Sequence, residues 1–204
     1  MELILVRHAE PATIESGLGP ANPGLTTRGV AQSNTLAQHL AAEGIAAIYR
    51  SPSRRTAGTA EPIAQRIGLD PTVDDRLGEF NLGSIDYLPV AELKRRNDPR
   101  WHALREGRIY DSPLGADGFR AQVLAVLDSI VARHPGEKVL VVTHAGVINV
   151  ITGSIIGMTR LIWTAPDLAS ISRIRVSRRG DRSLVSLNET GHLGSMQGAV
   201  EVSR

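Results

Sequence analysis

The sequence contains no cysteine, only two lysines (Lys94 and Lys138) and few aromatic residues. Without cysteine the chain can form no disulfide and no thiolate metal site, and it has no thiol nucleophile. This absence agrees with a reducing compartment, and we expect a cytoplasmic protein. No run of about 18 apolar residues is present. The N-terminus also lacks a basic segment followed by a long apolar one, so we expect neither a signal peptide nor a membrane span.

The charge balance gives little support for nucleic acid binding. The formal net charge is +2 and the pI is about 9.4. Because lysine is rare and cysteine is absent, few groups titrate between neutral pH and the arginines, so a small arginine excess raises the pI. The most basic stretch, 173–179, alternates in its first part as a strand does, which favours a solvated strand face. An arginine surplus also suits phosphorylated small molecules.

The residues that are present suffice for one globular domain. The chain has 204 residues, of which 42% are apolar and 22% charged, and we expect 1–204 to form a single domain. Strand-like runs alternate with helical segments. This pattern predicts a three-layer α/β sandwich with a mostly parallel sheet, helices on both faces and an antiparallel edge strand. We expect the segment 84–118 to form an irregular or helical cap over the functional site, and 195–204 to form a loose tail.

Two apolar runs each end in a histidine. Residues 3–6 lead into Arg7 and His8, and residues 139–142 lead through one threonine into His144. Small residues follow both histidines, and an amphipathic segment at 147–157 follows the second. In open α/β sheets ligands bind at the carboxyl ends of the strands. Small residues let the backbone approach a ligand, and amides at a helix N-terminus favour an anion. For the first run alone, a surface turn is an equal alternative.

Two further stretches place charged side chains near this edge. After a strand near 45–49, a helix that ends at about residue 67 carries Arg54 and Arg55 in its first turn. Cations there oppose the helix dipole, which an anion shared with the helix end would explain; a solvated arginine pair is the alternative. Glu79 lies between glycine and phenylalanine in a predicted loop. It is either a general acid with a raised pKa or an ordinary solvated carboxylate.

Taken together, these stretches resemble the histidine phosphatase superfamily, also called phosphoglycerate mutase-like. Five motifs occur in the family's order: Arg7-His8-Ala9, Leu25-Thr26-Thr27-Arg28-Gly29-Val30-Ala31-Gln32, Ser51-Pro52-Ser53-Arg54-Arg55 with Thr59-Ala60, Leu77-Gly78-Glu79 with Gly83, and Thr143-His144-Ala145-Gly146. The resemblance covers nearly the whole chain. It implies a phosphoglycerate mutase-like fold and a phosphoric monoester hydrolase of the histidine acid phosphatase type. Such an enzyme needs no metal and no cofactor, and its partner is a small phosphorylated metabolite.

The resemblance also implies a role for each charged residue. His8 would attack phosphorus and form a phosphohistidine. Arg7, Arg55 and His144 would hold the phosphoryl oxygens and neutralise developing charge. The two arginines would help to keep His8 neutral, as a nucleophile requires. For all four to contact one phosphoryl group, the two imidazoles must lie within about 8 Å of each other.

The remaining roles follow from the same motifs. Glu79 would protonate the leaving oxygen and then activate the water that hydrolyses the intermediate. Ala145 would add a backbone amide to the phosphoryl site. Spacing from Ser51 in the family pattern selects Arg55 over Arg54.

Three departures from the family pattern concern substrate binding. The polar residue, often asparagine, that usually follows the first histidine by six positions is Ile14 here. That phosphate contact is either missing or supplied from 11–24, where Asn22 is our choice. The usual Gly-x-Trp-Glu-Gly is replaced at 83–87, and the usual Gly-Glu-Ser at 115–117. The specific substrate cannot be read from these segments.

Two other functions compete with hydrolysis. Phosphoglycerate mutases of this family usually carry an arginine directly after the glutamate and a longer insert. Phe80 at that position and the short chain favour a phosphatase. The alternative from another class is a non-catalytic phospho-ligand binding or interaction module, against which the intact set of motif residues argues. We expect no nucleic acid or membrane partner, and the oligomeric state stays open, a homodimer included.

Overall fold

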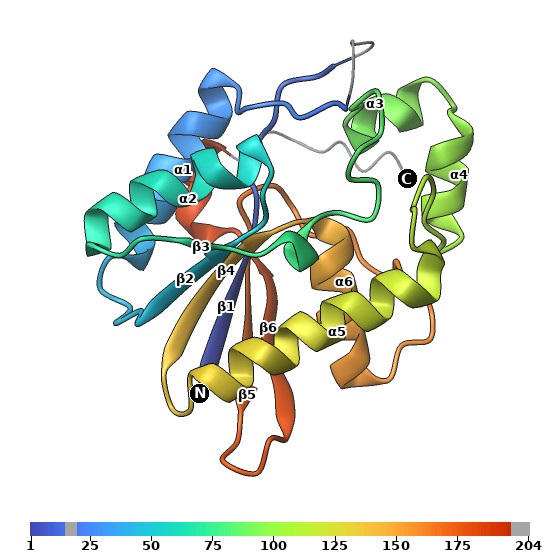
Figure 1. The fold of residues 1–204 in the computed structure, drawn as a ribbon. Helices are drawn as coiled ribbons and strands as arrows, with labels where there is room; N and C mark the ends of the chain where they lie inside the picture. Colours follow the sequence, from blue (N-terminus) through green and yellow to red (C-terminus); the bar gives the residue numbers. More distant parts are fainter. Residues whose placement is uncertain (15–19, 197–204) are drawn as a thin grey trace.

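Six strands form one sheet in the computed structural model, which describes residues 1–14 and 20–196 (Figure 1). They are β1 (Glu2–Arg7), β2 (Ala47–Arg50), β3 (Thr72–Val73), β4 (Lys138–Thr143), β5 (Ile171–Val176) and β6 (Arg182–Glu189), in the spatial order β3-β2-β4-β1-β5-β6. The first four pair in parallel, whereas β5 pairs antiparallel with β1 and β6 antiparallel with β5. The α/β class and the mostly parallel sheet are confirmed, and the antiparallel pairing at one edge involves two strands.

Each central strand serves two cores. Leu3 and Leu5 of β1 pack into one core, and Ile4 and Val6 pack into the other. Successive side chains of a strand point to opposite faces, so an unbroken apolar run is what a strand covered on both sides requires. Two helices cover each face (Figure 1): α1 (Thr27–Leu40) and α2 (Arg54–Ile67) on one, and α5 (Gly115–Arg133) and α6 (Ala145–Ile156) on the other. The three layers agree with the predicted sandwich.

Two short helices, α3 (Val90–Arg95) and α4 (Pro99–Arg105), lie beyond the carboxyl ends of the strands (Figure 1). Both belong to the segment 84–118, whose role as a cap stays a prediction. Two short 3-10 segments complete the fold. η1 (Asp75–Leu77) follows β3, and η2 (Gly191–Met196) follows β6. The predicted tail begins within η2, and its residues 197–204 lie outside the described part of the chain. None of the described helices combines the length and apolar character needed to cross a lipid bilayer.

The start of α1 is joined to the chain just after His8. Thr26 caps the helix by accepting a hydrogen bond from the Gly29 amide at 3.0 Å, and its own amide donates to the Glu10 carbonyl at 3.0 Å. A Cβ atom on Gly29 would lie only 2.2 Å from that carbonyl oxygen. Gln32 accepts from the Glu10 amide at 2.9 Å. The motif at 25–32 therefore holds the backbone that follows the first histidine.

We predict that Gly29→Ala lowers the free energy of unfolding by about 1–3 kcal/mol, because the added methyl group meets backbone that cannot yield as a side chain would. Urea denaturation measures the loss. Gly24→Ala is the matched control, since a Cβ at Gly24 would have open space. Equal losses in the two variants would show that the contact between Gly29 and Glu10 does not limit the packing.

Candidate active site

The two motif histidines lie side by side at the carboxyl ends of adjacent strands. β1 and β4 pair in parallel with Arg7 opposite Thr143, so His8 and His144 leave the sheet together. Their ring centroids are 5.2 Å apart with an angle of 62° between the planes, and both side chains are buried. The expected distance between the imidazoles is confirmed, well inside the limit of about 8 Å.

The protonation state of His8 is set by its surroundings. Its Nδ1 lies 2.8 Å from the carbonyl oxygen of Ala9, and a carbonyl can only accept, so Nδ1 carries the proton. Burial, together with the positive charges of Arg55 and Arg7, lowers the pKa of His8 well below its usual value. The ring is therefore neutral with an unprotonated Nε2, which is the form that can act as a nucleophile.

His144 is neutral for the same reasons. Its Nδ1 accepts a hydrogen bond from Arg55 Nη2 at 3.2 Å, because a guanidinium can only donate. Its Nε2 then carries the proton and donates to the Ser51 hydroxyl at 2.7 Å. Burial first, and then the positive charge of Arg55, lower the pKa of His144 well below its usual value, and the neighbouring His8 and Arg7 act in the same direction. These two bonds fix the ring between β2's end and α2.

Half-buried Arg7 and buried Arg55 bring positive charge to the histidines. Arg7 donates from Nη1 to the Pro166 carbonyl, and Arg55 is 3% exposed although its neighbour Arg54 faces solvent. Within the described residues, the Nε atoms of Arg7 and Arg55 are buried without a hydrogen-bond partner. An unsatisfied buried donor costs roughly 1–3 kcal/mol. These two N–H groups lack an acceptor and lie near two imidazoles, which points to a ligand with acceptor oxygens.

A carboxyl group completes the cluster. Glu79 accepts hydrogen bonds from the amide of Gly146 at 3.1 Å and from that of Phe80 at 3.2 Å. Burial raises the pKa of Glu79, although these bonds and the nearby arginines oppose the shift. A Cβ atom on Gly146 would lie 2.1 Å from Glu79 Oε1, so this position has no room for a side chain. A carboxyl with a raised pKa at this place is suited to proton transfer.

Tyr87 also reaches the cluster, although no sequence motif includes it. The centre of its ring lies 4.7 Å from the guanidinium carbon of Arg55. The segment that carries it matches the family pattern poorly, so no motif could have singled it out.

The two predicted substrate-binding residues lie beside or at the N-terminus of a helix. Asn22 is exposed and its Oδ1 accepts a hydrogen bond from the Arg54 amide at 2.9 Å, at the start of α2. Ala145 is the first residue of α6, so its amide belongs to a helix N-terminus. Contact of either residue with a ligand stays a prediction. Among residues 1–14 and 20–196, no three His, Asp or Glu side chains are grouped in a way that could hold a metal ion.

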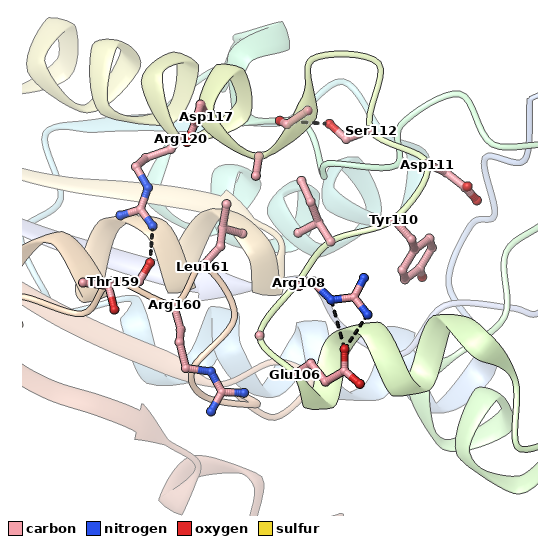
Figure 2. Close-up of a pocket in the computed structure, with 14 residues that line it drawn as sticks. Glu106, Arg108, Tyr110, Asp111, Ser112, Asp117, Arg120, Thr159, Arg160 and Leu161 are labelled. Atoms are coloured by element: carbon pink, nitrogen blue, oxygen red, sulfur yellow. Dashed lines mark hydrogen bonds and ion pairs between the residues drawn. The ribbon is translucent and has the colours of Figure 1, made fainter.

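A separate pocket of about 600 Å³ lies between the loop at 106–112, the start of α5 and the loop at 159–161 (Figure 2). Its arginines are engaged locally. Arg108 pairs with Glu106, and Arg120 donates to the Thr159 carbonyl at 2.9 Å. The predicted catalytic residues are not among those that line it. The pocket is therefore distinct from the histidine and arginine cluster.

Nearly the whole chain is similar to known proteins. A sequence profile of the histidine phosphatase superfamily (branch 1) matches residues 3–190. Phosphoserine phosphatase 1 of Hydrogenobacter thermophilus is 30% identical over 201 residues, which cover 95% of each chain. A bifunctional protein of Mycobacterium tuberculosis is 34% identical over 201 residues, or 94% of this chain and 54% of that protein, so the chain spans about half its length. The solved structure of YhfR from Bacillus stearothermophilus gives a TM-score of 0.76 at 25% identity, covering 94% of this chain and 98% of that one.

We predict that Arg55→Met raises the pKa of both His8 and His144, because it removes a buried positive charge that disfavours each imidazolium. Imidazole ¹⁵N NMR across a pH titration measures the change and reports the tautomer. Arg54→Met is the matched control, since Arg54 is the exposed neighbour in the same helix turn. Equal shifts in the two variants would contradict a local effect of Arg55.

Proposed function

The chain belongs to the histidine phosphatase superfamily, and from this we propose that it is a metal-independent phosphomonoesterase that hydrolyses a small phosphorylated metabolite through a phosphohistidine on His8. The observation that supports the proposal most is the convergence of four side chains. The ring centroids of His8 and His144 lie 5.2 Å apart, and half-buried Arg7 and buried Arg55 both lower the pKa of each ring. A cluster of two neutral imidazoles and two guanidinium groups suits a phosphoryl group.

In the first step the unprotonated Nε2 of His8 attacks phosphorus. A P–N bond forms and the bond from phosphorus to the leaving oxygen breaks. The Nδ1 proton, which is held on the Ala9 carbonyl, stabilises the positive charge that develops on the ring. Arg7 and Arg55 neutralise the charge on the phosphoryl oxygens in the transition state. The open Nε donors of these arginines are then satisfied by the ligand.

Glu79 serves both steps. As the neutral acid, favoured by burial, it donates its proton to the leaving oxygen. The resulting carboxylate then takes a proton from the water that attacks the phosphohistidine. The P–N bond breaks, inorganic phosphate is released, and His8 and Glu79 return to their starting protonation states.

His144 changes its role when a phosphoryl group arrives. In the free protein its Nδ1 accepts from Arg55. A nearby dianion raises the pKa of His144 because negative charge favours the imidazolium, and the ring can then donate to a phosphoryl oxygen. The Ala145 amide adds a donor from the start of α6. Asn22 stays in this proposal as the polar group of the 11–24 loop, although its Oδ1 is already used by the Arg54 amide.

Hydrolysis is preferred to mutase activity. Phe80, directly after Glu79, is buried, and its ring lies 5.2 Å from that of Tyr110. The mutases of the family usually have an arginine at this position, which could bind a carboxylated substrate. In this chain the position makes an apolar contact instead. A relative that matches over 95% of its own length is named a phosphoserine phosphatase, which also supports hydrolysis. A non-catalytic binding module is disfavoured because all the groups needed for chemistry are present together.

We predict that the protein releases stoichiometric phosphate from p-nitrophenyl phosphate and that His8→Ala lowers kcat/KM about a thousandfold or more, because the nucleophile is lost. Acid quenching followed by mass spectrometry should find the phosphoryl group on His8. His102→Ala is the control, since His102 bonds Asn97 away from the cluster. Unchanged activity in His8→Ala would reject this nucleophile, and transfer between 2- and 3-phosphoglycerate would favour the mutase. A screen of phosphorylated metabolites at several pH values then identifies the substrate.

We predict that Glu79→Gln lowers kcat by about a hundredfold or more, because proton transfer is lost, while the affinity for inorganic phosphate changes far less. Steady-state kinetics and phosphate inhibition measure the two quantities separately. Glu106→Gln, in the pair with Arg108, is the control. Equal losses of turnover and phosphate affinity would contradict the acid–base role of Glu79.

A further inference from the structure

Tyr87 lies against the phosphoryl-binding arginine. Its ring covers one face of the Arg55 guanidinium, with the ring centre 4.7 Å from the guanidinium carbon. Such a cation–π contact holds a guanidinium plane in place and excludes water from that face. The edge of Arg55, where its N–H groups lie, stays available to His144 and to a ligand.

The hydroxyl of Tyr87 lies within the electrostatic influence of the same charged cluster. Burial raises the pKa of Tyr87, and the positive charges of Arg55 and Arg7 oppose this shift. Among the described residues this hydroxyl makes no hydrogen bond. Tyr87 is half-buried, so its hydroxyl can be reached by a ligand. An available hydroxyl donor near two arginines whose Nε atoms are buried and unpartnered points to an acceptor that all three could share.

The backbone fixes Tyr87 in this place. Its amide donates to the Ile14 carbonyl at 2.8 Å, and the Ile14 amide donates back to the Tyr87 carbonyl at 3.0 Å. The preceding residue, Asp86, accepts from Arg100 of α4 at 2.9 and 3.0 Å. Ile14 has no polar side-chain atom to offer a phosphoryl group, but its backbone seats a residue that has one. Ile14, which stands where the family usually has a polar residue, is thus paired with Tyr87, whose hydroxyl can supply a polar contact to the phosphoryl group.

We propose that Tyr87 is a further binding residue of this site, whose ring orients Arg55 and whose hydroxyl donates a hydrogen bond to the substrate phosphoryl group. This inference rests on the proposed phosphatase function and deepens it. The hydroxyl contacts the phosphoryl group both before and during the reaction. Its loss therefore weakens substrate and phosphate binding more than it slows turnover.

The test compares Tyr87→Phe with the unaltered protein, because phenylalanine keeps the ring and removes only the hydroxyl. Calorimetric titration with inorganic phosphate and kinetics with p-nitrophenyl phosphate supply the readouts. We expect the phosphate Kd and the KM to rise together by about tenfold, the effect of one charge-assisted hydrogen bond, with a smaller change in kcat. Tyr87→Leu also removes the ring and should lower kcat as well, since Arg55 loses its support.

Tyr49→Phe is the matched control. The Tyr49 hydroxyl bonds His134 Nε2 at 2.9 Å, away from the site, so its loss should affect the thermal midpoint and leave KM and phosphate affinity unchanged. If Tyr87→Phe binds phosphate and turns over like the unaltered protein, the inference is wrong and the phosphatase proposal stands. If the unaltered protein neither binds phosphate nor hydrolyses any monoester, the phosphatase proposal fails and this inference fails with it.

Discussion

Two arginines and two histidines crowd together at the carboxyl ends of β1 and β4, and the surrounding structure keeps them there. Burying a guanidinium is costly unless hydrogen bonds hold it. Arg7 is held by the carbonyl of Pro166, and Arg55 lies between the His144 imidazole and the Tyr87 ring. The same positive charges keep both imidazoles neutral, so the electrostatic state of the site follows directly from its packing.

Loops from distant parts of the chain are tied to this cluster by polar contacts. The loop that carries Pro166 is held by Asn188 of β6, which accepts from the Asp167 amide at 2.6 Å and donates to its carboxylate at 2.9 Å. At the other side, the Thr143 hydroxyl donates to the Leu77 carbonyl at 2.8 Å, two residues before the glutamate of the site. Contacts made outside the cluster thus decide where its side chains lie.

Most of the fold could be predicted because its elements carry strong local patterns. The apolar runs of β1 and β4 indicate burial on both faces, and α2 ends where Gly68 adopts a left-handed φ of 73°. The first turn of α6 is not indicated by the sequence pattern. The helix begins at Ala145, whereas the apolar pattern covers 147–157. That turn is shaped by the close approach of Glu79 to Gly146, a long-range contact that no local pattern records.

By itself the sequence determined which chemical groups stand at the ends of which strands, because strand and helix periods are local properties. Only the tertiary structure decided which of those groups are neighbours and in what charge state. Arg54 and Arg55 are adjacent in one helix, yet successive residues point about 100° apart, and packing buries only the second. Tyr87 reaches Arg55 through pairing with Ile14. The neutral imidazoles depend on burial and nearby charge, which arise only when distant segments come together.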